Sequence, residues 1–331
     1  MGIKEEFIDY YKTHYENASL KVKNPENYLI RFFDGVEDKY LELVLNHIKV
    51  KGITFSHRNT FAFEPTRKKI ELQLNKNGDA NSMFHEFGHA IDYLSSVVVK
   101  KGRRYTTDDK TYTFSYKLSN GKSLNETLKQ EYKKNSKSIY EEIMSLFKEE
   151  VLDKLPQEMI KNAMQFRELN AEQSSLQRRF PLMRYNIYLY DEKKKKEDPL
   201  YIYNWQKHYK TREEAETAYK RFAEVNKYLD EHPELRQANQ DLRKTDLSKE
   251  FENNKSAIID ILSSTYQMRT HFASHTPGYY KRAGAIGEEF FANCFAYLAT
   301  NDIEGIENTK HFLPESYAMF TELVEVLIKE N

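Results

Sequence analysis

Residues 83–94 constrain the fold of this chain more than any other stretch. They carry the pattern His-Glu-x-x-His at His85, Glu86 and His89. On a helix, residues four apart lie on one face with their Cβ atoms about 5 to 6 Å apart, so both imidazoles can approach a single ion. The fold must therefore make this stretch helical and bring a further ligand to the same face.

The same stretch carries an apolar stripe. Four residues recur at helical spacing on the side away from the two imidazoles: Phe84, Phe87, Ile91 and Leu94. This spacing predicts a helix with separate core and ligand faces. Asp92 lies on the ligand side, where its carboxylate either orients a ligand imidazole or is an ordinary surface acid. Asn81 or Ser82 is expected to cap the helix.

A catalytic zinc site usually has three protein ligands and an open fourth position. The best source of the third ligand is a second predicted helix, residues 287–298. Glu289 and Asn293 share one stripe of it, beside an apolar stripe that can pack on the first helix: Phe291, Phe295 and Leu298. A carboxylate on such a helix is costly unless it is paired or bound to a metal. Glu289 is the expected third ligand, and a salt bridge to one of the many Lys is the other interpretation.

The residue types indicate the chemistry of such a site. His85, His89 and Glu289 would hold Zn²⁺, which lowers the pKa of water to about 7. Glu86 is not a ligand, and we expect it to act as the general base that takes the water proton. The pattern is therefore typical of a zinc hydrolase.

Both motifs resemble those of a known enzyme family. HEFGHAID at residues 85–92, followed far downstream by EFFAN at residues 289–293, is similar to the gluzincin metallopeptidases of the anthrax lethal factor type. It looks closer still to related peptidase-like domains of phage minor head proteins and mobile elements. The resemblance covers residues 60–95 and 255–330, and Asn293 follows the phage-type pattern.

The resemblance implies a zincin-like fold that hydrolyses peptide bonds with one zinc ion. It assigns the metal to the two motif His and Glu289, and the general base to Glu86. In that family a Tyr shortly before the third ligand assists the transition state. The candidates in this chain are Tyr279 and Tyr280.

Two other metal arrangements fit the residues less well. His271 and His275 are also four apart, but a Pro-Gly pair follows them and no Glu stands in the general-base position. The thimet-type oligopeptidases share His-Glu-Phe-Gly-His and place the third ligand much nearer. Only Glu126 is available there, in a segment with poor apolar support.

Composition narrows the partners and the compartment. The 331 residues suffice for one large or two modest domains, and 51 basic against 51 acidic residues give no sign of nucleic-acid binding. No run approaches 18 apolar residues and the N-terminus has no signal region, so no membrane association is expected. A single Cys excludes an intramolecular disulfide and favours the cytoplasm. Virion association and export by another route are the alternatives.

The remaining segments supply the scaffold. Residues 1–50 are expected to form an N-terminal helical segment of two helices, the second from about residue 25 to 50. Residues 51–331 form the zincin-like domain, with strands near 53–55, 61–63 and 69–74. The last strand alternates in polarity, and we expect it to be an edge strand that pairs with an extended substrate.

A long helical insertion, residues 101–253, is expected to separate the metal helix from its third ligand. It is charged and rich in Tyr, and its run at 191–198 is a solvated loop by composition. It is either a substrate lid or a docking arm. The predicted class is α+β, mainly helical, with a small mixed sheet.

The sequence predicts a zinc-dependent metallopeptidase that acts on polypeptides. The alternative is a structural or assembly protein of a phage or mobile element that keeps the zinc-binding domain and binds assembly partners. Glu86 separates the two hypotheses, because a purely structural zinc site has no use for a carboxylate that is not a ligand.

Overall fold

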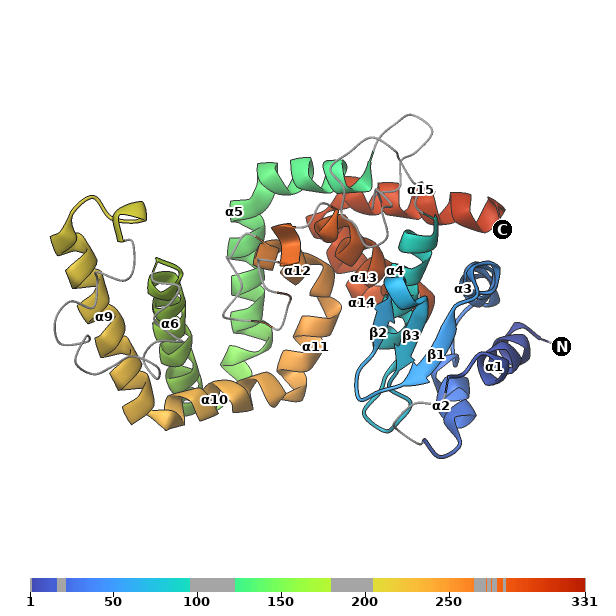
Figure 1. Ribbon diagram of the computed structural model, residues 1–331, viewed down its shortest axis with the longest axis horizontal. Helices are drawn as coiled ribbons and strands as arrows, with labels where there is room; N and C mark the ends of the chain where they lie inside the picture. The colour runs from blue at the N-terminus through green and yellow to red at the C-terminus, as the bar shows by residue number, and fades with distance from the viewer. Residues whose placement is uncertain are drawn as a thin grey trace. The chain divides into compact units, whose positions relative to one another are not determined.

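Figure 1 shows the computed structural model of the protein. The structure describes residues 2–16, 22–95, 123–179, 205–264, 272, 275, 279–281 and 284–330. Within these ranges the chain is mainly helical and has one small mixed sheet, which confirms the predicted α+β class. None of the helices in these ranges is long and apolar enough to cross a membrane.

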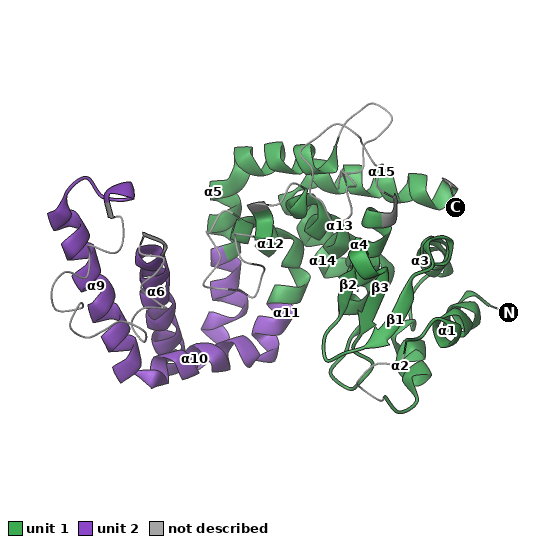
Figure 2. Ribbon diagram, in the orientation of Figure 1, with its two compact units in different colours: residues 1–143, 252–269, 273–331 green, residues 144–251, 270–272 purple. Residues whose placement is uncertain are grey.

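The chain divides into two compact units (Figure 2). Unit 1 comprises residues 1–143, 252–269 and 273–331, and unit 2 comprises residues 144–251 and 270–272. The sheet and both helices that carry the sequence motifs belong to unit 1. Unit 2 is built of helices in its described part.

The sheet contains three short strands: β1 (Thr54–His57), β2 (Ala62–Glu64) and β3 (Lys69–Leu72). Their order is β1-β3-β2, with β1 parallel and β2 antiparallel to β3. The register pairs Phe55 with Ile70 on one side and Phe63 with Ile70 on the other. All three strands lie close to where the sequence predicts them.

The prediction that residues 69–74 form an edge strand is wrong. β3 is the central strand, and its charged residues Lys69 and Glu71 are buried. Glu71 forms ion pairs with Arg58 (2.9 Å) and Lys69 (3.5 Å), so the charges neutralise one another. The alternation of polar and apolar residues is present, but its polar face is paired instead of exposed. Among the three described strands, β2 lies at an edge of the sheet, next to β3.

The N-terminal region forms three helices, where the sequence predicts two: α1 (Ile3–Thr13), α2 (Pro25–Phe32) and α3 (Asp38–Lys51). The expected long second helix is interrupted at Gly35, whose φ of 75° ends helical geometry. Phe7 of α1 contacts Phe33, Phe55 and Phe87, with ring centroids 4.9, 6.2 and 5.6 Å away. These helices therefore share a core with the metal-motif helix.

The centre of unit 1 is the pair α4 (Ala80–Ser95) and α13 (Ala285–Thr300), which pack along each other. Phe84, Phe87 and Ile91 are fully buried, which confirms the predicted core face of α4. The cap of α4 is Asp79, not Asn81 or Ser82, because its carboxylate accepts the Ser82 N–H at 2.7 Å.

Gly88 allows α4 and α13 to approach closely. A Cβ atom at this position would lie 2.8 Å from the Cα of Ala292 and 3.2 Å from its carbonyl oxygen. These are backbone atoms, which cannot turn aside as a flexible side chain can. The absence of a side chain at Gly88 thus sets the separation of the two helices, and with it the distance between the motif His and Glu289.

The rest of unit 1 supports this pair. Its helices are α12 (Ser256–Ser264), α14 (Ile303–Phe312), α15 (Pro314–Glu330) and most of α5 (Leu124–Glu150). α15 begins at Pro314, whose missing N–H is no loss at the first position of a helix. The buried carboxylate of Glu131 accepts the N–H groups of Glu315 and Ser316 at 2.9 Å each, which satisfies the first turn of α15.

Unit 2 contains the end of α5 with α6 (Gln157–Arg179), α9 (Arg212–Glu231), α10 (Pro233–Lys244) and the start of α11 (Asp246–Asn254). Its aromatic core includes Phe147, Phe251 and Phe272, with ring centroids 4.8 to 5.5 Å apart. Four short 3₁₀ segments complete the described elements: η1 (Pro65–Arg67), η2 (Leu152–Lys154), η3 (Trp205–Lys207) and η4 (Tyr279–Lys281). The charged run at 191–198 lies outside the described residues.

Candidate metal centre

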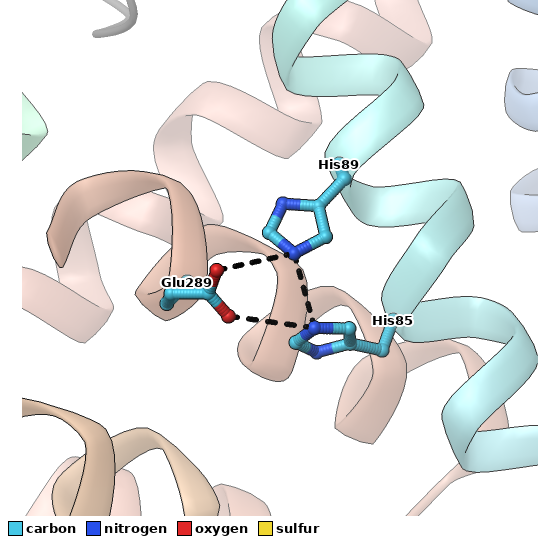
Figure 3. Close-up of side chains that lie close together, drawn as sticks. All are labelled: His85, His89 and Glu289. Carbon is cyan, nitrogen blue, oxygen red and sulfur yellow. Dashed lines mark hydrogen bonds and ion pairs between the residues drawn. The ribbon is translucent and has the colours of Figure 1, made fainter. Parts of the chain in front are cut away.

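Three predicted ligands meet between α4 and α13 (Figure 3). The Nε2 atoms of His85 and His89 lie 3.0 Å apart. Each is 3.5 Å from a different carboxylate oxygen of Glu289. The Glu289 side chain is 2% exposed, so its charge is almost fully withdrawn from water.

These distances fit a tetrahedral ion. Ligand atoms about 2.0 to 2.1 Å from a tetrahedral centre lie about 3.3 Å from one another. The measured separations of 3.0, 3.5 and 3.5 Å bracket this value. Two imidazoles and one carboxylate are a donor set that suits zinc, and three protein ligands leave a fourth position for water or substrate.

The same three groups perturb one another electrostatically. Burial alone would lower the pKa of His89, but the carboxylates, Glu289 above all, raise this pKa to about 9. Burial would raise the pKa of Glu289, but His89 and His85 hold it well below its usual range. A proton on the His89 imidazole thus provides the positive charge that faces Glu289, and a metal ion that binds His89 must displace this proton.

Glu86 lies beside the three ligand residues and is not one of them. Its Oε2 accepts the backbone N–H of Phe63 in β2 at 2.7 Å. The N–H of Phe63 donates to Glu86 and not to β3, so it points away from β3. It points toward the cavity that Glu86 lines. The carboxylate is thereby held between the metal helix and the free edge of the sheet.

The two candidate Tyr residues have different surroundings. The Tyr279 hydroxyl donates to Glu289 Oε1 at 2.6 Å, and its ring lines the cavity next to the ligands. Tyr280 is buried, and its hydroxyl donates to Asp260 at 2.7 Å. The structure therefore places Tyr279 at the candidate metal site and directs Tyr280 elsewhere.

His275 also reaches this site. Its ring stacks on Tyr279 with centroids 4.0 Å apart, and its Nε2 lies 3.5 Å from Glu289 Oε1. His271, its partner in the alternative metal pair, lies outside the described residues. His275 thus stands at the rim of the site that the motif His form.

Two cavities border this centre, and both are lined by Phe61, His85 and Glu86. The first is aromatic and acidic, with Phe63, Tyr93, Tyr279, Asp92 and Glu288 in its wall. The second is lined mostly by amides and hydroxyls, including Gln73, Asn81, Ser82, Asn253 and Ser256.

The side chain of Asp92 lines the first cavity but is only 4% exposed, so its interpretation as an ordinary surface acid is wrong.

Sequence reasoning missed one residue of this region. Asp260 hydrogen-bonds both Tyr280 and Asn293, and Asn293 in turn contacts His85. Asp260 is the only charged residue of α12, whose sequence is SAIIDILSS. The reasoning that singles out Glu289, a carboxylate on a largely apolar helix, also applies to Asp260.

Comparison of the chain with protein-family models, with curated proteins and with solved structures finds no match. The function is therefore argued from the site and its motifs.

Proposed function

We propose that this protein is a zinc-dependent metallopeptidase of the gluzincin type, with a zincin-like fold in unit 1. One observation carries the proposal: three donor groups stand at tetrahedral spacing, and Glu86, which is not among them, faces the same cavity. A structural zinc site needs only the ligands. A carboxylate next to an open coordination position is what hydrolysis requires.

Zinc, when bound, would polarise a carbonyl group and lower the pKa of water. Glu86 would take the proton of the attacking water and deliver it to the leaving amine. The hydrogen bond from Phe63 orients one oxygen of Glu86, which limits the rotation of this carboxylate. The Tyr279 hydroxyl, which donates to Glu289 in this structure, would instead donate a hydrogen bond to the developing oxyanion and keep its proton, so that it adds no charge to the site.

The proposed substrate is an extended polypeptide bound along β2. Among the described strands, β2 pairs with β3 alone, and its residues Ala62 and Phe63 line the cavity beside the candidate ligands. An edge strand offers backbone groups to a peptide that adds to the sheet. In β2 the outward N–H of Phe63 is bonded to Glu86, so the carbonyl of Phe63 is the group that would accept a hydrogen bond from the peptide. We therefore assign to residues 62–64 the pairing with an extended substrate that the sequence predicts for residues 69–74.

The test is Glu86→Gln, which keeps the size of the side chain and removes the base. Peptide hydrolysis should fall by about 10² to 10⁴-fold, while zinc content and thermal stability stay near those of the wild type. Cleavage of a broad peptide library, checked for inhibition by a chelator, measures the first quantity, and metal analysis measures the second. Equal cleavage by both proteins would contradict the role given to Glu86.

If the wild type binds zinc and cleaves nothing in the library, the result favours the assembly-protein alternative. Tyr279→Phe provides a matched comparison with Tyr280→Phe. Only the first removes a hydroxyl from the cavity, so only the first should slow hydrolysis.

A further inference from the structure

A chain of hydrogen bonds extends from His85 away from the metal position. His85 Nδ1 lies 3.0 Å from the Oδ1 of Asn293. The Nδ2 of Asn293 donates to Asp260 Oδ2 at 2.9 Å, and Tyr280 donates to the other oxygen, Oδ1, at 2.7 Å. The four residues come from α4, α13, α12 and η4, so the tertiary fold assembles the chain.

With Asp260 ionised, the order of donors and acceptors in this chain has one consistent solution. A carboxylate only accepts, so the amide of Asn293 must present its NH₂ to Asp260 and its oxygen to His85. Ser256 donates to the same amide oxygen at 3.0 Å. That oxygen cannot donate, so the hydrogen in the contact with His85 must belong to Nδ1. The lone pair of the imidazole is then on Nε2, the atom that faces Glu289 and His89.

We infer that Asp260 is a positioning residue of the metal centre, which acts through Asn293 to hold His85 in the tautomer and orientation that bind a metal. This inference rests on the proposed zinc site. It also assigns Tyr280 to the support of Asp260. Asn293 alone could rotate its amide by 180° and present NH₂ to the imidazole, and Asp260 is the group that prevents this.

The expected effect is on metal affinity. Removing a group that orients a ligand imidazole typically weakens metal binding 10 to 100-fold. A network that only stabilises the fold would instead lower the melting temperature of the metal-free protein and leave the affinity of the folded protein unchanged. Zinc affinity and metal-free stability must therefore be measured on the same variants.

The sharpest experiment exchanges the two side chains. In the double variant Asp260→Asn with Asn293→Asp, the new carboxylate at 293 can accept from His85 and from the new amide at 260. The oxygen of that amide can accept from Tyr280. All three bonds are kept and the net charge is unchanged, while the amide and the carboxylate trade places.

Zinc affinity of the full chain is measured by competition with a chelating dye. Asn293→Ala should bind zinc about 10 to 100-fold more weakly. Asn293→Asp alone should also bind weakly, because it sets two carboxylates against each other and removes the amide donor. The exchange variant should recover to within a few-fold of the wild type. Tyr280→Phe keeps the bond between Asn293 and Asp260 and serves as the control with a small effect.

The inference is overturned if Asn293→Ala binds zinc as tightly as the wild type, or if the exchange variant binds no better than Asn293→Asp. Either result, with zinc bound to the wild type, leaves the proposed function standing. Absence of zinc binding by the wild type would overturn both. A melting curve of each metal-free variant separates loss of affinity from loss of fold.

Discussion

Unit 2 buries polar groups in a different way from the candidate metal centre of unit 1. Arg167 in α6 is 2% exposed, donates to Asn239 of α10 at 2.7 Å, and lies over the ring of Phe147 at 5.5 Å. These groups face one another inside a packed core. In the metal centre, the donor atoms of His85, His89 and Glu289 face a common point at the wall of a cavity.

The difference separates a polar group that stabilises a fold from one that forms a site. Arg167 donates a hydrogen bond to Asn239 and lies over the ring of Phe147, so contacts inside the core offset part of the cost of burying it. The three ligand residues place two basic nitrogens and a carboxylate at tetrahedral spacing, an arrangement completed by an added cation. Burial alone does not indicate function, whereas convergence on one point does.

The largest effect should come from removing one converging ligand. His89→Ala or Glu289→Gln should reduce bound zinc from about one ion per chain to almost none, because two ligands hold the ion far less tightly than three. Metal analysis after dialysis measures this. If Glu289→Gln keeps its zinc, the third ligand is another residue, and Glu288 and His275 are candidates because they line the same cavity.

Gly88→Ala tests whether the spacing of the candidate ligands matters. It should move His85 and His89 relative to Glu289 without replacing any of the three. The added methyl group would lie 2.8 Å from the backbone of Ala292, so α4 and α13 must separate. We expect weaker zinc binding and a loss of about 1 to 3 kcal/mol in stability. An ordinary helical Gly→Ala change stabilises by about 1 kcal/mol, so the sign of the result reports the helix contact. A stabilised variant with unchanged zinc affinity would contradict this account.

Arg167→Met tests the other side of the comparison. It leaves the oxygen of Asn239 without its buried donor, which should cost about 1 to 3 kcal/mol in the free energy of unfolding. Zinc affinity of the folded protein should stay at the wild-type value. Denaturant titration and dye competition measure the two quantities. A loss of zinc affinity would show that Arg167 influences the metal centre.

The sequence predicts the convergent site better than it predicts the surroundings of that site. The spacing of His85 and His89 requires only a helix, and Glu289 stands out because its helix is largely apolar. The central place of residues 69–72 depends on their pairing with both other strands, and the buried Glu71 forms an ion pair with Arg58 from outside the strand. The link from Asn293 to Asp260 joins residues 33 apart through the tertiary fold. The helical periodicity of a sequence does not predict such contacts between separate elements.

The smallest effect we predict is on the pH dependence of the metal-free protein. The pKa of His89 is raised from 6.5 to about 9, so its pairing with Glu289 stabilises the fold fully below about pH 6.5. This contribution is lost as the pH rises through about 9. The pKa of Glu289 is lowered, so its contribution is present above its ordinary value of 4.5 and is lost as the pH falls further.

Melting curves without metal should therefore show stability that declines between about pH 6.5 and 9. Zinc binding should strengthen over the same range, because fewer protons compete for His89. His89→Gln should flatten the decline, while Arg167→Met should lower the whole curve and keep its slope. If His89→Gln keeps the wild-type slope, another group causes the dependence, and the convergent charges of the metal centre are no more sensitive to pH than the paired groups of unit 2.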